Sequence, residues 1–272
     1  MHARIVLGGR EVRIDLAHGV DLALPLDFHG AQPRHFGAPP ASAQPLRLGD
    51  FEGAVALGAS CNCEVITLTP HCNGTHTECV GHLTRERVDA FRVAPPGLVP
   101  GLLVTVAAQA ASRCREGSDP APRAADALIT RHALEQAWQR TPYEPRALIV
   151  RTLPNDAGKR GHDYSDETPP YLSREAAQLL VERGILHLII DLPSIDRAHD
   201  AGRLTAHRVF FGLPPGSHEL AGAARPDATI TELAFIPDEL ADGAYLLALQ
   251  VPALAGDAVP SRPLLYALGS GA

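Results

Sequence analysis

The sequence predicts a mixed α/β fold in a single domain spanning residues 1–272, and three observations support this prediction. Short apolar or alternating runs with the length of strands recur along the chain. Amphipathic segments with helix-capping residues stand between some of them. No internal repeat or linker divides the chain, and the contents of 45% hydrophobic and 20% charged residues are typical of a globular protein.

The N-terminal region predicts a hairpin followed by an irregular segment. Residues 4–7 and 11–15 alternate around Gly8-Gly9, and both turn positions of a tight hairpin favour glycine because they need positive φ. Residues 29–50 are rich in Pro, Ala and Gly, which predicts an extended loop or arm. Residues 64–69 then have the composition of a strand.

A strand–helix–strand unit between residues 147 and 191 is the main indication of α/β architecture. Residues 147–151 form an apolar run, and Ser173 can cap a helix that Gly184 ends. Residues 185–191 are almost continuously apolar, as in a strand covered on both faces. Further expected elements are a strand at 102–106, a helix at 131–140 capped by Thr130, a helix near 204–211, and strands near 229–235, 244–250 and 264–268.

Charge and composition exclude several classes of protein. The net charge of -7 disfavours nucleic-acid binding. No run of about eighteen apolar residues exists, so we expect no membrane span. Five cysteines, an odd number, argue against a disulfide framework and indicate a cytoplasmic protein.

The segment from His71 to His82 carries the strongest chemical signal, with three histidines, two cysteines and a glutamate in twelve residues. A buried group of such side chains is costly unless it is paired or binds a cation. His76 and Glu78 alternate along an extended backbone and therefore point to the same side. His82 can reach them if the chain turns at Gly81. These ligand types predict a divalent metal, Zn or Mn, that activates water.

This segment resembles the signature of the cyclase-like metal hydrolases, which include bacterial kynurenine formamidase (arylformamidase) and isatin hydrolase. Their pattern is His-x-Gly-Thr-His-x-Asp-x-Pro-x-His. Gly74-Thr75-His76 match it, Glu78 stands at the Asp position, Val80 at the Pro position, and His82 closes it. Further pieces recur in the same order: residues 172–177 with Gly184, the Asp-x-x-Ser-x-Asp segment at 191–196, His207, Glu232, and Pro-x-Arg at 260–262.

The resemblance implies a swivelling β/β/α fold, a mixed sheet or barrel with flanking helices. It implies that His76 and Glu78 bind metal, with Glu78 able to bridge two cations, and that His207 and Glu232 complete a second site. His82 is then the acid–base residue. The implied reaction is hydrolysis of an amide-type C–N bond, in a formamide, lactam or similar small and often aromatic molecule, through metal-bound hydroxide. Homodimers or higher homo-oligomers are also implied, with the arm at 29–50 available for exchange between subunits.

The first ligand position is left open between two residues. The family's first histidine stands two residues before the glycine, where this chain has Cys72, and His71 is displaced by one position. Either Cys72 binds as a thiolate, or His71 binds if the turn is bulged. One or two ions remain possible.

The Cys72 substitution also motivates an alternative function, a small-molecule binding protein that keeps the fold and metal without turnover. A purely structural zinc site is disfavoured because no four-cysteine set exists. Asp191 and Asp196 are predicted to be structural. His29, His35 and Phe36 either line a substrate pocket or lie in a surface loop.

Overall fold

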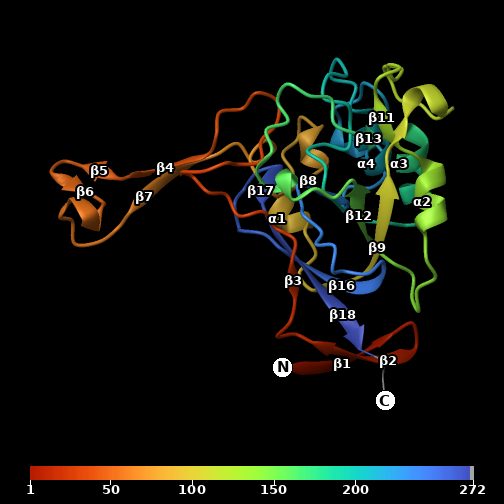
Figure 1. Cartoon of the computed structure of the whole chain (residues 1–272), viewed down its shortest axis with the longest axis horizontal. Coiled ribbons are helices and arrows are strands. Elements are labelled where there is room, and N and C mark those ends of the chain that lie inside the picture. The colour runs from red at the N-terminus through yellow and green to blue at the C-terminus, as the bar shows by residue number, and fades with distance from the viewer. Residues whose placement is uncertain (270–272) are drawn as a thin grey trace.

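A long mixed sheet organises the computed structural model, which describes residues 1–269 (Figure 1). Its hydrogen-bonded order is β1 (His2–Leu7), β2 (Arg10–Asp15), β18 (Arg262–Gly269), β16 (Gly243–Gln250), β9 (Leu98–Ala107), β12 (Ala147–Leu153), β14 (His187–Ile190), β15 (Thr229–Glu232), β8 (His76–Cys79) and β17 (Ala258–Pro260). Strand β3 (Val20–Asp21) pairs with β18. Strands β9, β12, β14 and β15 run parallel, whereas β16 and β8 flank them antiparallel. The α/β prediction is confirmed, and the order of strands is open and not closed into a barrel.

The parallel strands are apolar on both faces because both faces are covered. Leu148 and Val150 of β12 pack with the helices, while Ile149 packs in a second core with residues of β16 and β18. This alternation places successive residues of a strand in different cores. The near-continuous apolar runs in the sequence follow from this double burial.

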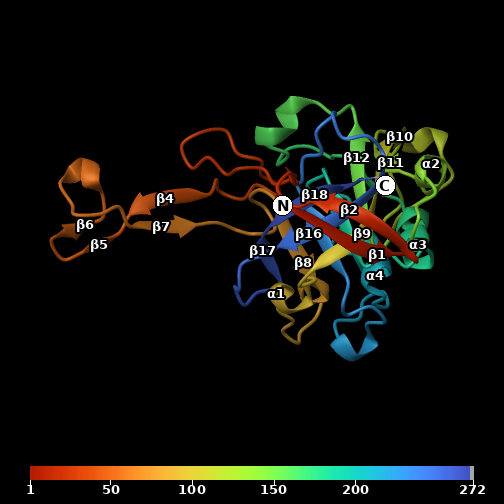
Figure 2. The same ribbon diagram turned by 90° about the horizontal axis from the view of Figure 1, so that it is seen from below.

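Within residues 1–269, four α-helices accompany the sheet: α1 (Ala90–Val93), α2 (Arg131–Ala137), α3 (Arg174–Glu182) and α4 (Thr205–Phe211). Helices α2, α3 and α4 pack together beside β9 and β12 (Figures 1 and 2). Both predicted caps are present, since the Thr130 hydroxyl accepts a hydrogen bond from Ala133 N and the Ser173 hydroxyl from Ala176 N. Helix α2 is shorter than the predicted 131–140, because the backbone becomes extended at Trp138.

The predicted N-terminal hairpin is confirmed as β1 and β2. Gly8 and Gly9 form the turn with φ values of 54° and 76°.

Smaller elements complete the described structure. Strands β10 (Gln109–Ala110), β11 (Ala127–Ile129) and β13 (Tyr171–Leu172) form a separate sheet. The short 3₁₀ helices are η2 (Val80–His82), η3 (Ala111–Arg113), η4 (Ala157–Gly161) and η5 (Leu220–Gly222). Among residues 1–269, no helix is both long and apolar enough to cross a membrane.

An arm projects from the body of the molecule (Figures 1 and 2). It consists of β4 (Ser42–Pro45) paired antiparallel with β7 (Glu64–Thr67), and its tip holds β5 (Arg47–Leu48), β6 (Phe51–Glu52) and η1 (Val55–Leu57). The prediction of an extended loop or arm at 29–50 is confirmed in part: residues 29–41 are largely irregular and 42–50 belong to the arm, but β4 and β5 give the arm regular structure that was not expected. The arm runs from 42 to 67 because the strand predicted at 64–69 pairs with 42–45 and not with the central sheet.

Candidate metal centre

The turn before β8 fixes the start of the histidine-rich segment. The backbone N–H groups of Cys72 and Asn73 both donate to Thr69 O, and the Asn73 side chain accepts from Thr69 N at 2.8 Å. Gly74 has a φ of 71°, a conformation that other residues rarely adopt. The Thr75 hydroxyl accepts from Leu24 N at 2.8 Å. These contacts fix the backbone just before β8 and thereby the directions of the side chains that β8 carries.

Strand register places a second carboxylate opposite the motif. Strand β8 lies between β15 and β17, and Glu232 of β15 is the direct cross-strand partner of His76. Their side chains meet, with His76 Nε2 3.4 Å from Glu232 Oε2. Cross-strand partners share one face of a sheet, so Glu232 joins His76 and Glu78 on the same side.

Glu78 is the centre of the cluster and is 1% exposed. Its Oε1 lies 2.7 Å from His207 Nε2, and its Oε2 lies 2.9 Å from His71 Nδ1. His82 is farther away, with its Nδ1 4.0 Å from Oε2. Glu78 thus faces three imidazoles, from the turn before β8, from η2 after it and from α4.

Helix α4 carries His207 into the cluster, and Asp196 fixes it there. The Asp196 carboxylate accepts backbone hydrogen bonds from Ala206 N and His207 N at the first turn of α4. It also lies 2.7 Å from His207 Nδ1, which leaves Nε2 facing Glu78. Glu232 Oε1 lies 3.7 Å from the same Nε2 and accepts from Ile195 N at 2.7 Å. The predicted residues His76, Glu78, His207 and Glu232 therefore lie together in space.

The buried carboxylates and imidazoles at the centre shift one another's pKa values. Burial favours the neutral form of Glu78, but His82, His207 and His71 outweigh it and hold the pKa of this carboxyl well below its usual range. Burial likewise opposes charge on His207, yet Glu78 and Asp196 raise its pKa well above the usual value. Against burial, Asp257 and Glu78 raise the pKa of His71 to about 10. In the absence of a metal, these carboxylates therefore favour the protonated form of His71 and of His207.

The donor set fits a divalent cation. Three groups of side chains each bring ligand atoms within 4.8 Å of one another: His71, His76 and Glu78; Glu78, His82 and His207; and His71, His82 and Asp257. Imidazole and carboxylate are ligands that zinc and manganese accept. The buried Nε2 of His76 makes no hydrogen bond among the described residues and lies 3.4 Å from Glu232 Oε2. Buried polar atoms of this kind call for a partner, and a cation would supply it.

His71 belongs to two of the three groups that could hold an ion, whereas Cys72 belongs to none among the described residues. The ring of His71 reaches Glu78 from its displaced position because the turn at 69–73 directs it toward β8. Cys72 is partly buried, and burial together with the nearby charge of Glu232 raises the pKa of its thiol. Among the described residues, none of the three groups that could hold an ion contains Cys72.

The sequence did not identify Asp257 as a member of the cluster, and it predicted only a structural role for Asp196. Asp257, in the loop before β17, lies 2.7 Å from His71 Nε2 and 3.6 Å from His82 Nδ1. It follows Gly256, and no local sequence pattern marks it as a ligand. Asp196, expected to be structural, does bond backbone groups but also orients His207. Asp191 has a structural role, because it accepts from Thr152 N and pairs with Lys159.

The N-terminal segment contributes to a hollow beside the centre. Phe36, 50% exposed, lines a hollow of about 640 Å³ together with Asp196, Arg197 and His199. His35 packs against Phe36, with ring centroids 3.9 Å apart, and is buried, and its ring nitrogens make no hydrogen bond within residues 1–269. His29 is exposed. Phe36 thus fits the pocket alternative, whereas His29 lies in a surface turn.

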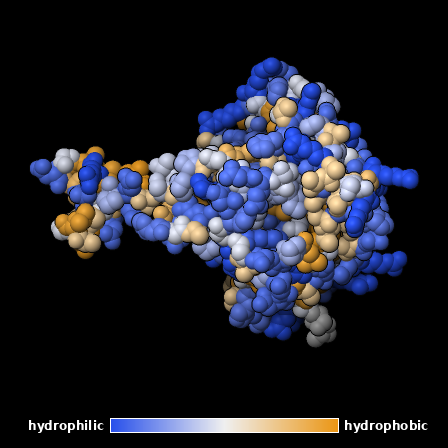
Figure 3. Space-filling view, turned by 45° about the horizontal axis from the view of Figure 1, so that its top comes forward, coloured by the Kyte–Doolittle hydropathy of each residue, from blue (hydrophilic) through white to orange (hydrophobic). Residues whose placement is uncertain are grey.

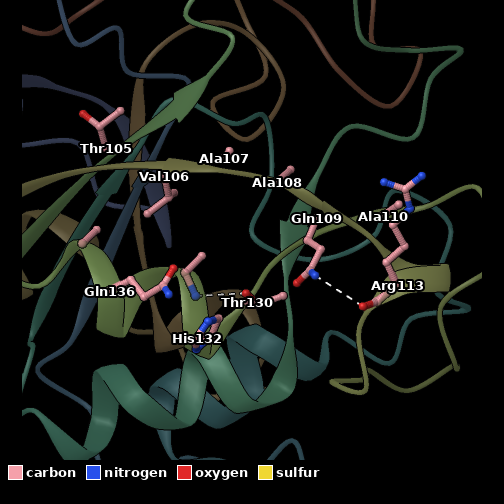
Figure 4. Close-up of a pocket in the computed structure, with 12 residues that line it drawn as sticks. Thr105, Val106, Ala107, Ala108, Gln109, Ala110, Arg113, Thr130, His132 and Gln136 are labelled. Carbon is pink, nitrogen blue, oxygen red and sulfur yellow. Dashed lines mark hydrogen bonds between the residues drawn. The ribbon is translucent and has the colours of Figure 1, made fainter.

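A second hollow of similar volume lies away from the cluster (Figure 4). It is lined by the end of β9 and the first residues of α2, including Thr105, Thr130 and His132. Figure 4 shows two hydrogen bonds within its lining, from Gln109 Nε2 to Arg113 O and from Ala133 N to the Thr130 hydroxyl. Its lining contains no residue of the candidate metal centre, so size alone does not identify the functional site.

Comparison with known proteins agrees with this description. The cyclase family model, described as "putative cyclase", matches residues 14–197. No curated protein sequence matches the chain significantly. Among solved structures, isatin hydrolase A from Ralstonia solanacearum is 16% identical with a TM-score of 0.59, and the match covers 92% of this chain and 91% of that one. An isatin hydrolase bound to the product analogue thioisatinate is 16% identical with a TM-score of 0.57, covering 93% of each chain.

A predicted metal-dependent hydrolase from Bacillus stearothermophilus is also 16% identical, with a TM-score of 0.56 and coverage of 92% of this chain and 98% of that one. At this level of identity the likeness concerns the fold. The family match covers well over half of the chain, and the motif residues converge in the structure. The chain therefore belongs to the cyclase family, whose structural neighbours include metal-dependent hydrolases.

Proposed function

We propose that the protein is a metal-dependent hydrolase that cleaves an amide-type C–N bond of a small, often aromatic molecule. The observation that carries the proposal is the convergence of Glu78 with His71 and His207, beside the buried Nε2 of His76, which faces Glu232 at 3.4 Å. A bound Zn or Mn ion would lower the pKa of a coordinated water and polarise the substrate carbonyl. Isatin hydrolase, a neighbour in fold, acts on a molecule of this kind, and formamides, lactams and cyclic imides share its reacting group.

Different side chains would bind the metal, transfer protons and contact the substrate. His71, His76, Glu78, His207 and Glu232 would hold the metal, as one or two ions. His82, whose ring is a quarter exposed and lies 4.0 Å from Glu78, would move protons to and from the reacting atoms. Phe36 would contact the ring of an aromatic substrate from the neighbouring hollow, because its own ring is half exposed there.

Metal analysis combined with a substrate panel tests this proposal. The protein purified without chelator is expected to contain Zn or Mn and to hydrolyse at least one class among formamides, lactams and cyclic imides. Stripping the metal with EDTA should remove the activity, and adding it back should restore it. A protein that retains metal but hydrolyses no member of the panel would instead be a binding protein without turnover.

Metal binding is expected to release protons and to tighten as the pH rises. At pH 7 His71, with a pKa of about 10, and His207, with a raised pKa, are protonated in the metal-free protein. Both must become neutral to bind a cation, whereas Glu78 is already ionised and releases nothing. Calorimetry in buffers of different ionisation enthalpy should show release of about two protons, and the affinity should increase from pH 7 toward pH 10. An affinity that does not change across this range would contradict the charge arrangement.

We propose that the arm joins two copies of this chain in a homodimer or larger homo-oligomer. Five large apolar side chains on it are 49–66% exposed: Leu48, Val55, Leu57, Val65 and Ile66. Figure 3 shows apolar surface gathered at the end of the projecting arm. Apolar patches of this kind on a protruding element are typical of protein interfaces.

The double substitution Val55→Asp and Leu57→Asp is therefore expected to convert the oligomer to a monomer in light-scattering measurements. Charged groups in the centre of an apolar interface would be desolvated without partners. The matched control is Val6→Asp, at a side chain 71% exposed on β1, which should keep the mass of the wild type. A wild-type protein that is already monomeric would refute the proposed assembly.

We also propose that the whole chain acts as one cytoplasmic domain. Strands from both ends of the chain pair in the same sheet, since β18 lies next to β2, so no simple cut separates two units. All five cysteines are free thiols, as expected in a reducing compartment.

A further inference from the structure

We propose that Asp257 is a positioning residue that holds His71 in the orientation needed to bind the metal. The inference rests on the proposed function and adds a residue to it. Asp257 Oδ2 lies 2.7 Å from His71 Nε2, while the other ring nitrogen, Nδ1, lies 2.9 Å from Glu78 Oε2. His71 is thus held between two carboxylates at opposite ends of its ring.

The backbone around Asp257 is fixed to the strand that carries Glu78. Asp257 O accepts a hydrogen bond from Cys79 N at 3.0 Å, and Gly256 O accepts one from Ala90 N at 2.7 Å. The next residue, Ala258, is the cross-strand partner of Glu78 in β17. The carboxylate of Asp257 therefore has a defined position relative to Glu78 and does not depend on a free loop.

The contact determines which nitrogen of His71 faces the metal. If Nε2–H donates to Asp257, the neutral imidazole carries its lone pair on Nδ1, on the side of Glu78. Carboxylates that accept the second N–H of a ligating histidine fix the ring and increase its basicity. His71 needs this support because it comes from a turn and not from β8, and its side chain is 25% exposed.

The same arrangement explains how the chain tolerates Cys72 at the position of the family's first histidine. His71 stands one residue earlier, and Asp257 directs its ring back toward Glu78 from the opposite side. Histidine and aspartate thus together occupy the place that a single histidine fills in the family pattern. His207 and Asp196 form a matching pair, since Asp196 Oδ2 lies 2.7 Å from His207 Nδ1.

A competing explanation is that Asp257 is itself a ligand. It forms, with His71 and His82, one of the three groups whose donor atoms lie within 4.8 Å of one another. The two roles predict different effects of the substitution Asp257→Asn on metal affinity. The amide oxygen still accepts from Nε2–H, so positioning survives, whereas the charge that makes a carboxylate a good metal ligand is lost.

The test measures the affinity of EDTA-stripped protein for Zn²⁺ and for Mn²⁺ by calorimetry, without any substrate. Asp257→Ala is expected to weaken binding by about 10- to 100-fold, and Asp257→Asn to stay within about fivefold of the wild type. In a His71→Ala background, Asp257→Ala should have no further effect, because the residue acts through His71. The control is Asp166→Asn, an exposed carboxylate that makes no hydrogen bond or ion pair within residues 1–269. Thermal unfolding of each variant checks that it is folded.

The outcomes separate this inference from the proposed function. Wild-type protein that binds neither ion would refute the proposed function itself. Normal affinity of the wild type and of Asp257→Ala would overturn only the role of Asp257. Equal losses in Asp257→Ala and Asp257→Asn would identify a ligand and overturn positioning. A further loss in the His71→Ala background would show that Asp257 acts through another group, such as His82, and would also overturn it.

Discussion

Glu78→Gln is expected to remove both the metal and the activity, lowering turnover by more than about 10³-fold. Glu78 contacts His71 and His207 and belongs to two of the three groups that could hold an ion. Glutamine keeps the size of the side chain but supplies no charge to a cation. Without the metal, the pKa of the attacking water returns toward about 15.7. Metal content by mass spectrometry and turnover on the best substrate of the panel would measure the two effects.

Glu78→Asp is the matched control, because it keeps the charge and restores the residue of the family pattern. It shortens the side chain by one methylene, so the 2.7 Å contact to His207 must lengthen or the backbone must adjust. We expect it to retain metal with reduced turnover. Full metal occupancy and normal turnover in Glu78→Gln would show that this carboxylate is only a structural ion-pair partner.

His82→Ala is expected to lower turnover by about 10²- to 10⁴-fold while the metal content stays close to that of the wild type. The ring of His82 lies beside those of His71 and His207, with centroids 4.2 Å and 5.6 Å away. Its Nδ1 is 4.0 Å from Glu78, a longer distance than those of His71 and His207. It is also about a quarter exposed, as suits a group that exchanges protons with a substrate.

The matched control for this variant is His132→Ala, which removes an exposed imidazole on α2 at the hollow in Figure 4. This substitution should change neither activity nor metal content. Loss of metal from His82→Ala, in parallel with its activity, would identify His82 as a ligand, as its presence in a group with Glu78 and His207 allows. Unchanged turnover would exclude a role in proton transfer.

Local patterns were sufficient where neighbouring residues determine the structure. The hairpin at Gly8-Gly9 follows from turn geometry, and the caps at Thr130 and Ser173 follow from hydroxyls that accept backbone N–H groups. The run at 185–191 predicts a strand covered on both faces, and β14 at 187–190 is covered on both. The family pattern likewise pointed to His76 and Glu78, since alternation along one strand puts both side chains on one side.

Pairings between distant segments could not be derived in this way. The extent of the arm was not predicted because nothing in residues 42–45 indicates that they pair with 64–67. The choice between His71 and Cys72 stayed open because it depends on the direction of a turn. Asp257 was missed because its contact with His71 joins residues 186 positions apart.

The sequence by itself thus determined the class of fold, the helix starts set by caps, and the concentration of histidine and glutamate side chains, suited to a metal, in residues 71–82. Only the tertiary structure decided which carboxylates face those histidines. Strand register placed Glu232 opposite His76, and the first turn of α4 placed His207 against Asp196. The physical reason is range: capping and alternation act over a few residues, whereas the positions of Glu232, Asp196 and Asp257 depend on how strands far apart in the chain pair in one sheet.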